Sequence, residues 1–366
     1  MGIEVVTITA GGGRWTAFEE FHVNAAFNKA ARSFSIEVAA ELGGSATNAV
    51  FAVGTEVTIS ANGDLLLTGY VDCREPSFAA KKAIISVSGR SKSADLIDSS
   101  GEHETGQFEN KDPLEIGQEI SSNYAPKWVT DQQLEKIEQY QLTPGETCFR
   151  CVEKLARQQG MTITGTPDGN AKITKGAQGR NGALIEGVNI LAGTAHHNGS
   201  NRHSKIVVRG QRPFGHGDDN LEIEAQEQDS AVQRNRTIII IQDEDTTKDR
   251  AKKRAKNRKN RAAGNALKAS ISVQGFHDDG GKLWTPGALT WTQSAFLDIA
   301  QDMLIESVDY RQNDGGSIAV LNLVDPRAYD GEGAGGGKGN KSGSDWNFPG
   351  NPLGGETSVP VGTPPV

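Results

Sequence analysis

Short runs of alternating apolar and polar residues fill the first 90 positions of the chain. In one of them, Phe34, Ile36 and Val38 alternate with Ser35 and Glu37. A period of two is typical of β-strands that bury one face. Similar runs lie at residues 4–9, 57–60, 65–67 and 83–88. The region therefore predicts a small closed or nearly closed β-barrel.

Asn62 and Gly63 stand between two of these runs. Both residue types accept positive φ angles, which a two-residue hairpin turn requires. The pattern predicts a tight β-hairpin at this point.

The periodicity becomes helical between residues 91 and 180, with stretches at 91–98, 113–124 and 144–159. For the last stretch, Thr143 is the predicted N-cap, Pro144 the first helical residue and Gly160 the terminator. Its predicted core face is Phe149, Val152, Leu155 and Ala156. Short strands are expected at 161–164 and 171–174. These elements predict a separate α/β domain.

Strand patterns return after residue 183 and predict a second barrel. They cover residues 205–208, 237–241, 269–273, 289–292, 303–310 and 317–324. One basic helix, residues 246–266, interrupts them. Its small-residue stripe, Ala251, Ala255, Ala262 and Ala266, can pack closely on a sheet.

The expected domains are therefore a first barrel at 1–95, an α/β domain at 96–180, a second barrel at 181–328 that includes the basic helix, and a tail at 329–366. The tail is rich in Gly, Pro and Ser, and we expect it to be flexible because it buries too little apolar surface.

Charge is unevenly distributed along the 366 residues. The net charge is −8, yet residues 248–261 hold nine basic residues and one acidic residue, which leaves −16 for the remainder. A bulk so acidic disfavours general nucleic-acid binding. The chain has three cysteines and no long apolar run, so we expect a soluble protein made in a reducing cytoplasm, without an export signal.

Cys148 and Cys151 have the spacing of a redox motif, in a helical turn where the helix dipole would lower a thiol pKa. No thioredoxin-like βαβ pattern precedes them, and no second pair completes a zinc site. A structural pair of partly buried thiols is the favoured interpretation.

Four histidines and two aspartates fall within a short Gly/Asn-rich stretch and are candidate metal ligands. They are His196, His197, His203, His216, Asp218 and Asp219. Their spacing matches no closed site, so solvated side chains are favoured. We expect no metal, no cofactor and no catalytic residue.

The basic helix admits two interpretations. Its charges could neutralise phosphates, but no aromatic residue interrupts the basic run to stack on bases. Packing against an acidic protein surface is favoured, and Arg250, Arg254, Arg258 and Arg261 are the interface candidates.

Several stretches together resemble the baseplate hub proteins of contractile phage tails, of the phage Mu type, and the related late control D-type tail proteins. They are residues 67–72 followed by 89–98, residues 202–211, the Ile-rich strand with the basic helix, and residues 273–276 followed by 283–287. Within them the motif residues are Gly69, Tyr70, Asp72, Gly89, Arg90, Asp95, Gly210, Trp284 and Pro286.

This resemblance implies a mainly β protein with α+β character: two tube-protein-like β-barrels and an α/β middle domain, assembling as a trimeric ring. The ring would adapt a hexameric tail tube to a trimeric spike and line the DNA channel without specific DNA binding. Tape measure and baseplate wedge proteins are further expected partners, the virion is the expected location, and membrane insertion is not expected. We also expect an acidic channel wall. Two alternatives stay open: a tail-associated peptidoglycan hydrolase, and a DNA-binding protein that uses the basic helix.

Overall fold

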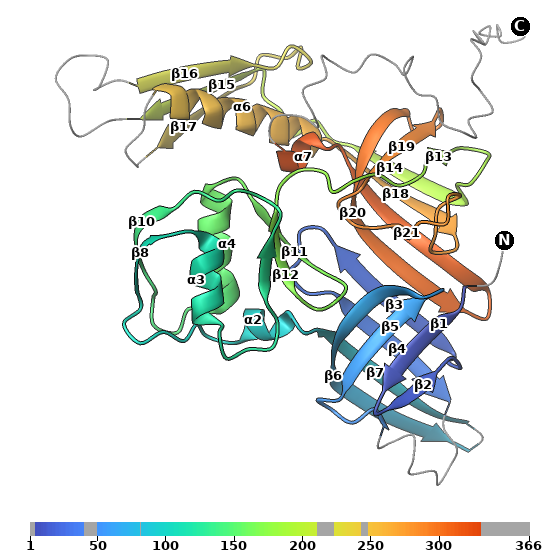
Figure 1. Ribbon diagram of the computed structural model, residues 1–366. Coiled ribbons are helices and arrows are strands. Elements are labelled where there is room, and N and C mark those ends of the chain that lie inside the picture. Colours follow the sequence, from blue (N-terminus) through green and yellow to red (C-terminus); the bar gives the residue numbers. More distant parts are fainter. Residues whose placement is uncertain (1–3, 40–49, 81, 211–222, 243–247, 331–366) are drawn as a thin grey trace, which may run out of the picture.

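The structure is a computed structural model and describes residues 4–39, 50–80, 82–210, 223–242 and 248–330 (Figure 1). Its largest element is a 13-stranded sheet. The strands are β1 (Val6–Ala10), β2 (Gly13–Trp15), β3 (Glu20–Ala26), β4 (Ser33–Ala39), β5 (Glu56–Ala61), β6 (Asp64–Ala79), β7 (Lys82–Ser91), β13 (Leu184–Ile185), β14 (Ala192–His197), β18 (Leu267–Gln274), β19 (Leu289–Ser294), β20 (Ile299–Asn313) and β21 (Gly316–Val324). Their order is β14-β18-β21-β20-β3-β4-β7-β6-β5-β1-β2, with β19 paired to β20 and to β13.

One hydrophobic core underlies this sheet and includes residues from both ends of the chain. The rings of Phe21 and Phe276 lie 6.2 Å apart, and those of Phe276 and Tyr310 lie 5.4 Å apart. All three side chains are fully buried. Because burying an aromatic side chain stabilises a fold by about 1.5–3 kcal/mol, this cluster ties the two regions firmly together.

The expected pair of separate barrels is corrected by this sheet. Strands of both regions form one continuous sheet, and no closed barrel is found among the described residues. The joining strand is β3, which pairs with β4 on one side and β20 on the other. Its alternation of Phe21, Val23 and Ala25 with His22 and Asn24 is a strand pattern that the sequence analysis missed.

The predicted hairpin is confirmed. Ala61 pairs with Asp64, and the two residues between them, Asn62 and Gly63, have φ angles of 50° and 97°. Beyond this turn β6 is much longer than predicted and continues to Ala79.

The large sheet contains the same four-stranded arrangement twice. Repeat A consists of β3, β4, β6 and β7, with β5 between β4 and β6 along the chain, and its strands lie in the order β3-β4-β7-β6. In repeat B, strands β14, β18, β20 and β21 lie in the equivalent order β14-β18-β21-β20. In each repeat the third strand along the chain, β6 or β20, has a bulge. The part of that strand before the bulge pairs with an additional strand, which is β5 for β6 and β19 for β20. The eight strands of the two repeats are all antiparallel to their neighbours within this order. The repeats follow head to tail, because β20 of repeat B joins β3 of repeat A.

A second hydrophobic core belongs to the middle of the chain. Its elements are α2 (Ala94–Asp98), β8 (Gln107–Lys111), α3 (Pro113–Ile120), β9 (Trp128–Thr130), β10 (Ile137–Gln141), α4 (Cys148–Gln158), β11 (Thr162–Gly165) and β12 (Ala171–Thr174). Val152, Leu155 and Ala156 of α4 are buried as predicted, and Phe149 is partly buried.

The predicted start of α4 is wrong. The N-cap is Thr147, whose hydroxyl accepts a hydrogen bond from the Arg150 amide at 3.2 Å. Gly145 has a φ of 83°, in the left-handed region, so a helix cannot run through it from Pro144. The predicted end is confirmed, because Gly160 follows α4 with a φ of 74°.

The third unit is a small sheet covered by the basic helix, at the upper left of Figure 1. It consists of β15 (Lys205–Gly210), β16 (Ile223–Gln228), β17 (Thr237–Gln242) and α6 (Lys248–Gly264), with α7 (Arg327–Asp330) against α6. Ala251 and Ala255 pack on β15 and β16, and Ala262 is also buried, as the small-residue stripe predicted. Ala266 lies beyond the helix end.

This packing corrects the expectation that the basic helix lies on the second barrel. The sheet under α6 is separate from the 13-stranded sheet and has its own core. The domain boundaries at 95, 180 and 328 stay predictions, and the tail after residue 330 lies outside the described residues. Among the helices of the described residues, none combines the length and apolarity that a bilayer crossing requires.

Candidate assembly surfaces

The side of repeats A and B that faces away from the core is polar, and we call it the polar face. Its residues form rows of directly opposed cross-strand neighbours. One row is Ser272, Val320, Asp309, Asn24, Ser33 and Arg90, and the next is Ile318, Arg311, His22, Ser35, Ser88 and Cys73. Serine, asparagine and charged side chains make up most of the two rows. Because each row crosses from β20 to β3, the polar face is continuous across the junction between the repeats.

A carboxylate row marks one end of the polar face. Glu20 lies opposite Glu37, Glu37 opposite Ser86, and Ser86 opposite Glu75. The three glutamates line a hollow of about 200 Å³. Like charges directly opposite one another in a sheet are destabilising. Because this row does not stabilise the fold, it fits a surface that serves the assembly or lines a channel.

A hydrogen-bonded cluster joins the repeats at the centre of this face. His22 Nε2 and Asn24 Nδ2, both on β3, lie 2.9 and 3.0 Å from Asp309 Oδ1 on β20. Burial opposes ionisation of Asp309, but the bonds to His22 and Asn24 outweigh it and lower its pKa. The junction between the repeats is thus held by charge-assisted bonds in addition to the strand ladder.

Most of the sequence motif converges where β6, β7 and α2 meet. Arg90 Nε lies 2.8 Å from Asp72 Oδ2, and Arg90 Nη2 lies 2.7 Å from Asp98 Oδ2. Both hydrogen bonds raise the pKa of Arg90 above its usual range. Burial, together with the charges of Asp72 and Asp98, raises the pKa of Asp95. The arrangement anchors α2 to the large sheet.

The two motif glycines of this region allow the strands to approach closely. A Cβ on Gly69 would lie 1.9 Å from the Arg90 carbonyl oxygen, and one on Gly89 would lie 2.0 Å from the Tyr70 carbonyl oxygen. Gly210 lies elsewhere, at the end of β15 opposite Ile223. At Gly69 and Gly89, the structure therefore explains why the motif has glycine: any side chain would collide with the neighbouring strand.

The basic helix presents its arginines to solvent. Arg250, Arg254, Arg258 and Arg261 are all exposed, whereas Ala251, Ala255 and Ala262 of the same helix are buried. Lys259 is held differently, with its Nζ 2.8 Å from Glu227 Oε2 of the underlying sheet. The exposed arginines remain candidates for an interface.

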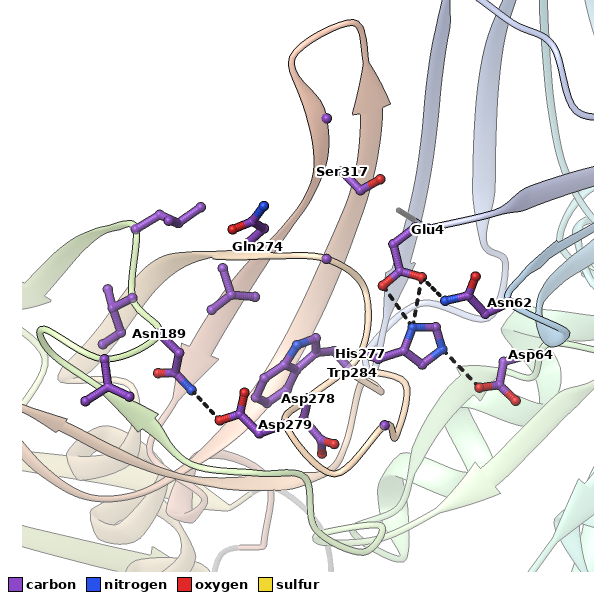
Figure 2. Close-up of a pocket in the computed structure, with 17 residues that line it drawn as sticks. Glu4, Asn62, Asp64, Asn189, Gln274, His277, Asp278, Asp279, Trp284 and Ser317 are labelled. Atoms are coloured by element: carbon purple, nitrogen blue, oxygen red, sulfur yellow. Dashed lines mark hydrogen bonds and ion pairs between the residues drawn. The ribbon is translucent and has the colours of Figure 1, made fainter. Parts of the chain in front are cut away.

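A pocket of about 610 Å³ separates the N-terminal strands from the loop after β18 (Figure 2). His277 bridges it, with Nδ1 3.0 Å from Glu4 Oε1 and Nε2 3.1 Å from Asp64 Oδ2. Glu4 also accepts hydrogen bonds from the Phe276 amide and the Asn62 side chain. Burial disfavours protonation of His277, but the hydrogen bonds and charges of Glu4 and Asp64 outweigh it and raise its pKa.

This bridge was missed because its residues are 273 positions apart in the chain, and no local pattern links Glu4 to His277. The predicted motif residue Trp284 is buried and lines the same pocket (Figure 2). Pro286 is also buried, in the loop that leads into β19.

The cysteine pair is buried, as a structural pair would be. Cys148 and Cys151 are free thiols with no exposed surface. The expected lowering of a thiol pKa by the helix dipole is wrong, because burial raises the pKa of each to about 11. Cys73 is exposed.

The histidine stretch does not converge in the part of the chain that the structure describes. His196 and His197 alternate on β14, and His203 lies in the following loop. His216, Asp218 and Asp219 lie outside the described residues. Within the described ranges, no group of three or more His, Cys, Asp or Glu side chains is placed to hold a metal ion.

Three family models match successive parts of the chain. They describe the N-terminal domain of Mu phage baseplate assembly protein GpP-like proteins (residues 5–91), the second domain of gp44-like baseplate hub proteins (residues 93–175), and the fourth domain of Mu phage baseplate assembly protein GpP (residues 246–332). Baseplate hub protein gp44 of Escherichia phage Mu is 25% identical over 334 residues, which is 88% of each chain.

Solved structures agree with these matches. The 43 kDa tail protein of prophage MuSo2 from Shewanella oneidensis has a TM-score of 0.78 and 28% identity, with 89% of this chain and 100% of that chain covered. The tail protein from Neisseria meningitidis MC58 has a TM-score of 0.74 and 17% identity, with 91% and 100% covered, and shares the fold.

These relatives are parts of phage tails, and the matched domains are those of hub and baseplate assembly proteins. The protein is therefore a structural component of a phage tail rather than an enzyme. Its domains, sequence and fold together place the chain in the family of Mu-type phage baseplate hub proteins.

Proposed function

We propose that three copies of the chain form a ring in the baseplate, which adapts a hexameric tail tube to a trimeric central spike and lines the DNA channel. The proposal places the protein in the virion after synthesis in the bacterial cytoplasm. Tube and spike are its principal partners, with tape measure and wedge proteins as further ones.

The observation that carries this proposal is the internal repeat. Repeats A and B have the same strand order, the same direction of every strand and a bulge in the same strand. A head-to-tail arrangement of similar units closes into a ring when the rotation between units divides a full turn. Three chains with two repeats each supply six similar units, which suits a sixfold tube on one side and a threefold spike on the other.

The polar face supports the channel. Its carboxylates, Glu20, Glu37 and Glu75, would repel DNA phosphates, and its serines add no positive charge that could hold them. If this face lines the ring, DNA can pass without being held.

The exposed arginines of α6 support a contact with a neighbouring subunit. Outside residues 248–261 the chain carries a net charge of −16, so a second copy offers an acidic surface to the helix. Complementary charge of this kind guides assembly more than it adds affinity.

Mass and symmetry test the proposal directly. The intact chain has a mass of 39.0 kDa, so a trimer would have three times that mass, 117 kDa, by light scattering after size exclusion. Electron microscopy of the same sample should show a threefold annulus. A monomer at all protein concentrations, also in the presence of the cognate spike, would contradict the ring.

A further inference from the structure

We propose that residues 73–79 of β6 in one copy pair antiparallel with β14 of the next copy, in the register that sets Glu75 opposite His196 and Ser77 opposite Thr194. The proposal rests on the ring proposed above and names the strands that close it.

The first step is that both strands present an open edge. Among the described residues, β14 pairs only with β18, and beyond its bulge β6 pairs only with β7. Thr194 and His196 are exposed, as are Glu75 and Ser77. An open edge of this length is a template for another strand.

The second step is that the chain already contains one example of the junction. Repeat B ends in the bulged strand β20, and repeat A begins with β3, which pairs with β20 beyond its bulge. Repeat A ends in the bulged strand β6, and repeat B begins with β14. Continuing the same head-to-tail order therefore brings β14 of a second copy to β6.

The third step fixes equivalent residues through the ladders. The first paired residue after each bulge is Cys73 in β6 and Ser307 in β20, so Glu75 corresponds to Asp309 and Ser77 to Arg311. Cys73 pairs with Ser88, and Ser307 pairs with Asn322, so Ser88 and Asn322 are also equivalent.

From these neighbours the ladders lead to the first strands of the repeats. Ser88 pairs with Ser35, and Ser35 with His22. Likewise Asn322 pairs with Ser270, and Ser270 with Thr194. His22 therefore corresponds to Thr194, and Asn24, two residues on, to His196.

The register follows by transfer. Within the chain Asp309 lies opposite Asn24, and Arg311 lies opposite His22. Their equivalents place Glu75 opposite His196, and Ser77 opposite Thr194. A carboxylate again meets an imidazole, as Asp309 meets His22 at 2.9 Å within the chain. The polar face then continues unbroken from one copy to the next.

The opposite side of β6 supplies an independent argument. Phe78 is 83% exposed, which is unusual for an aromatic side chain. The same register sets Phe78 opposite Gly193, where a Cβ would lie 3.0 Å from Leu297 Cδ1 and 3.8 Å from Ile190 Cγ2. The ring of Phe78 can lie over the glycine and contact both apolar side chains. Pro76 has no amide proton, so this ladder has one donor fewer than that of β20 and β3.

A disulfide pair tests the register. Directly opposed residues of an antiparallel pair have Cβ atoms about 4.5–5.5 Å apart, which a disulfide can span after small adjustments. In a Cys73→Ser background, Ser77→Cys with Thr194→Cys should give covalent dimers and trimers on a non-reducing gel after mild oxidation. Ser77→Cys with Ala195→Cys is the matched control, because Ala195 points to the other side of β14.

The outcomes separate the two proposals. An annulus seen by microscopy without cross-links in the Ser77/Thr194 variant, or with equal cross-links in the control, overturns the register while the ring stands. If the parent chain forms neither annulus nor trimer, the proposed ring itself fails.

Phe78→Ser tests the apolar contact without disturbing the folded chain, since the side chain is exposed. The dissociation constant of the trimer should rise about ten-fold or more, because the variant loses the burial of an aromatic side chain at the contact. Ile241→Ser, an exposed apolar residue on β17 and outside the large sheet, should leave the trimer unchanged. A Phe78→Ser trimer as stable as the parent would overturn the placement of Phe78.

Discussion

At the scale of single residues, the motif glycines illustrate what sequence can and cannot reveal. Gly69 and Gly89 stood out by their place in a family pattern, but their reason is spatial. Each lies where a Cβ would meet a carbonyl oxygen of the neighbouring strand at about 2 Å. A pattern identifies such positions, whereas only the paired strands explain them.

Gly69→Ala should destabilise the protein strongly, by about 3 kcal/mol or more, because backbone rather than a flexible side chain occupies the space. The free energy of unfolding in urea measures the effect. Gly199→Ala is the control, since no atom lies within 4 Å of the added methyl group. Equal stability of the two variants would contradict the close approach.

His277 should make stability depend on pH. Its folded-state pKa is raised, so its bridge to Glu4 and Asp64 contributes fully below the ordinary histidine pKa of about 6.5. The contribution is lost as the pH rises through the raised value. The unfolding free energy of the parent should therefore fall over this range relative to that of His277→Gln. Parallel pH profiles of the two proteins would argue against a charged bridge.

At the scale of elements, local patterns predicted what local physics decides. The Asn62-Gly63 hairpin, the end of α4 at Gly160 and the buried face of the basic helix all follow from nearby residues. The N-cap of α4 was placed four residues early, because Thr143 and Pro144 resemble a helix start until the left-handed Gly145 is known. Which sheet α6 covers depends on pairing between distant strands, and the sequence carries no local signal for it.

Charge reversal on α6 tests its interface role. Arg254→Glu with Arg258→Glu should weaken ring assembly more at low salt than at high salt, because salt screens exposed charges. Sedimentation at two ionic strengths measures this. Lys127→Glu with Lys136→Glu makes the same change in charge at exposed positions of the middle unit and should have little effect. Unchanged assembly with reduced DNA binding would favour a nucleic-acid role for the helix.

At the scale of the whole molecule, the resemblance anticipated two similar strand-rich regions, but not their fusion into one sheet. The contact between the regions is made by β3 and β20, whose paired residues lie more than 280 positions apart in the chain. Glu4 and His277 are equally remote. Such pairings depend on the complete topology. The pocket lined by Glu4 and His277 could therefore not be predicted from local sequence patterns.

The polar face should determine how DNA interacts with the assembled protein. Replacing Glu20, Glu37 and Glu75 by lysine should create DNA binding whose affinity falls steeply with salt, because each phosphate contact releases a counterion. Lysine replacements at Glu104, Glu109 and Glu138, exposed in the middle unit, are the matched control. Fluorescence anisotropy of a labelled duplex measures both. Equal binding by the two triple variants would argue against a channel wall at this face.

The position of β3 between β4 and β20 also has a consequence for biosynthesis. Residues 20–26 leave the ribosome early, whereas their partners at 307–312 are made almost 300 residues later. At about 5–20 residues per second, the nascent chain holds one strand edge unsatisfied for roughly 15–60 s. Chaperone binding to translating ribosomes should therefore begin soon after β3 emerges and end once β20 has been synthesised.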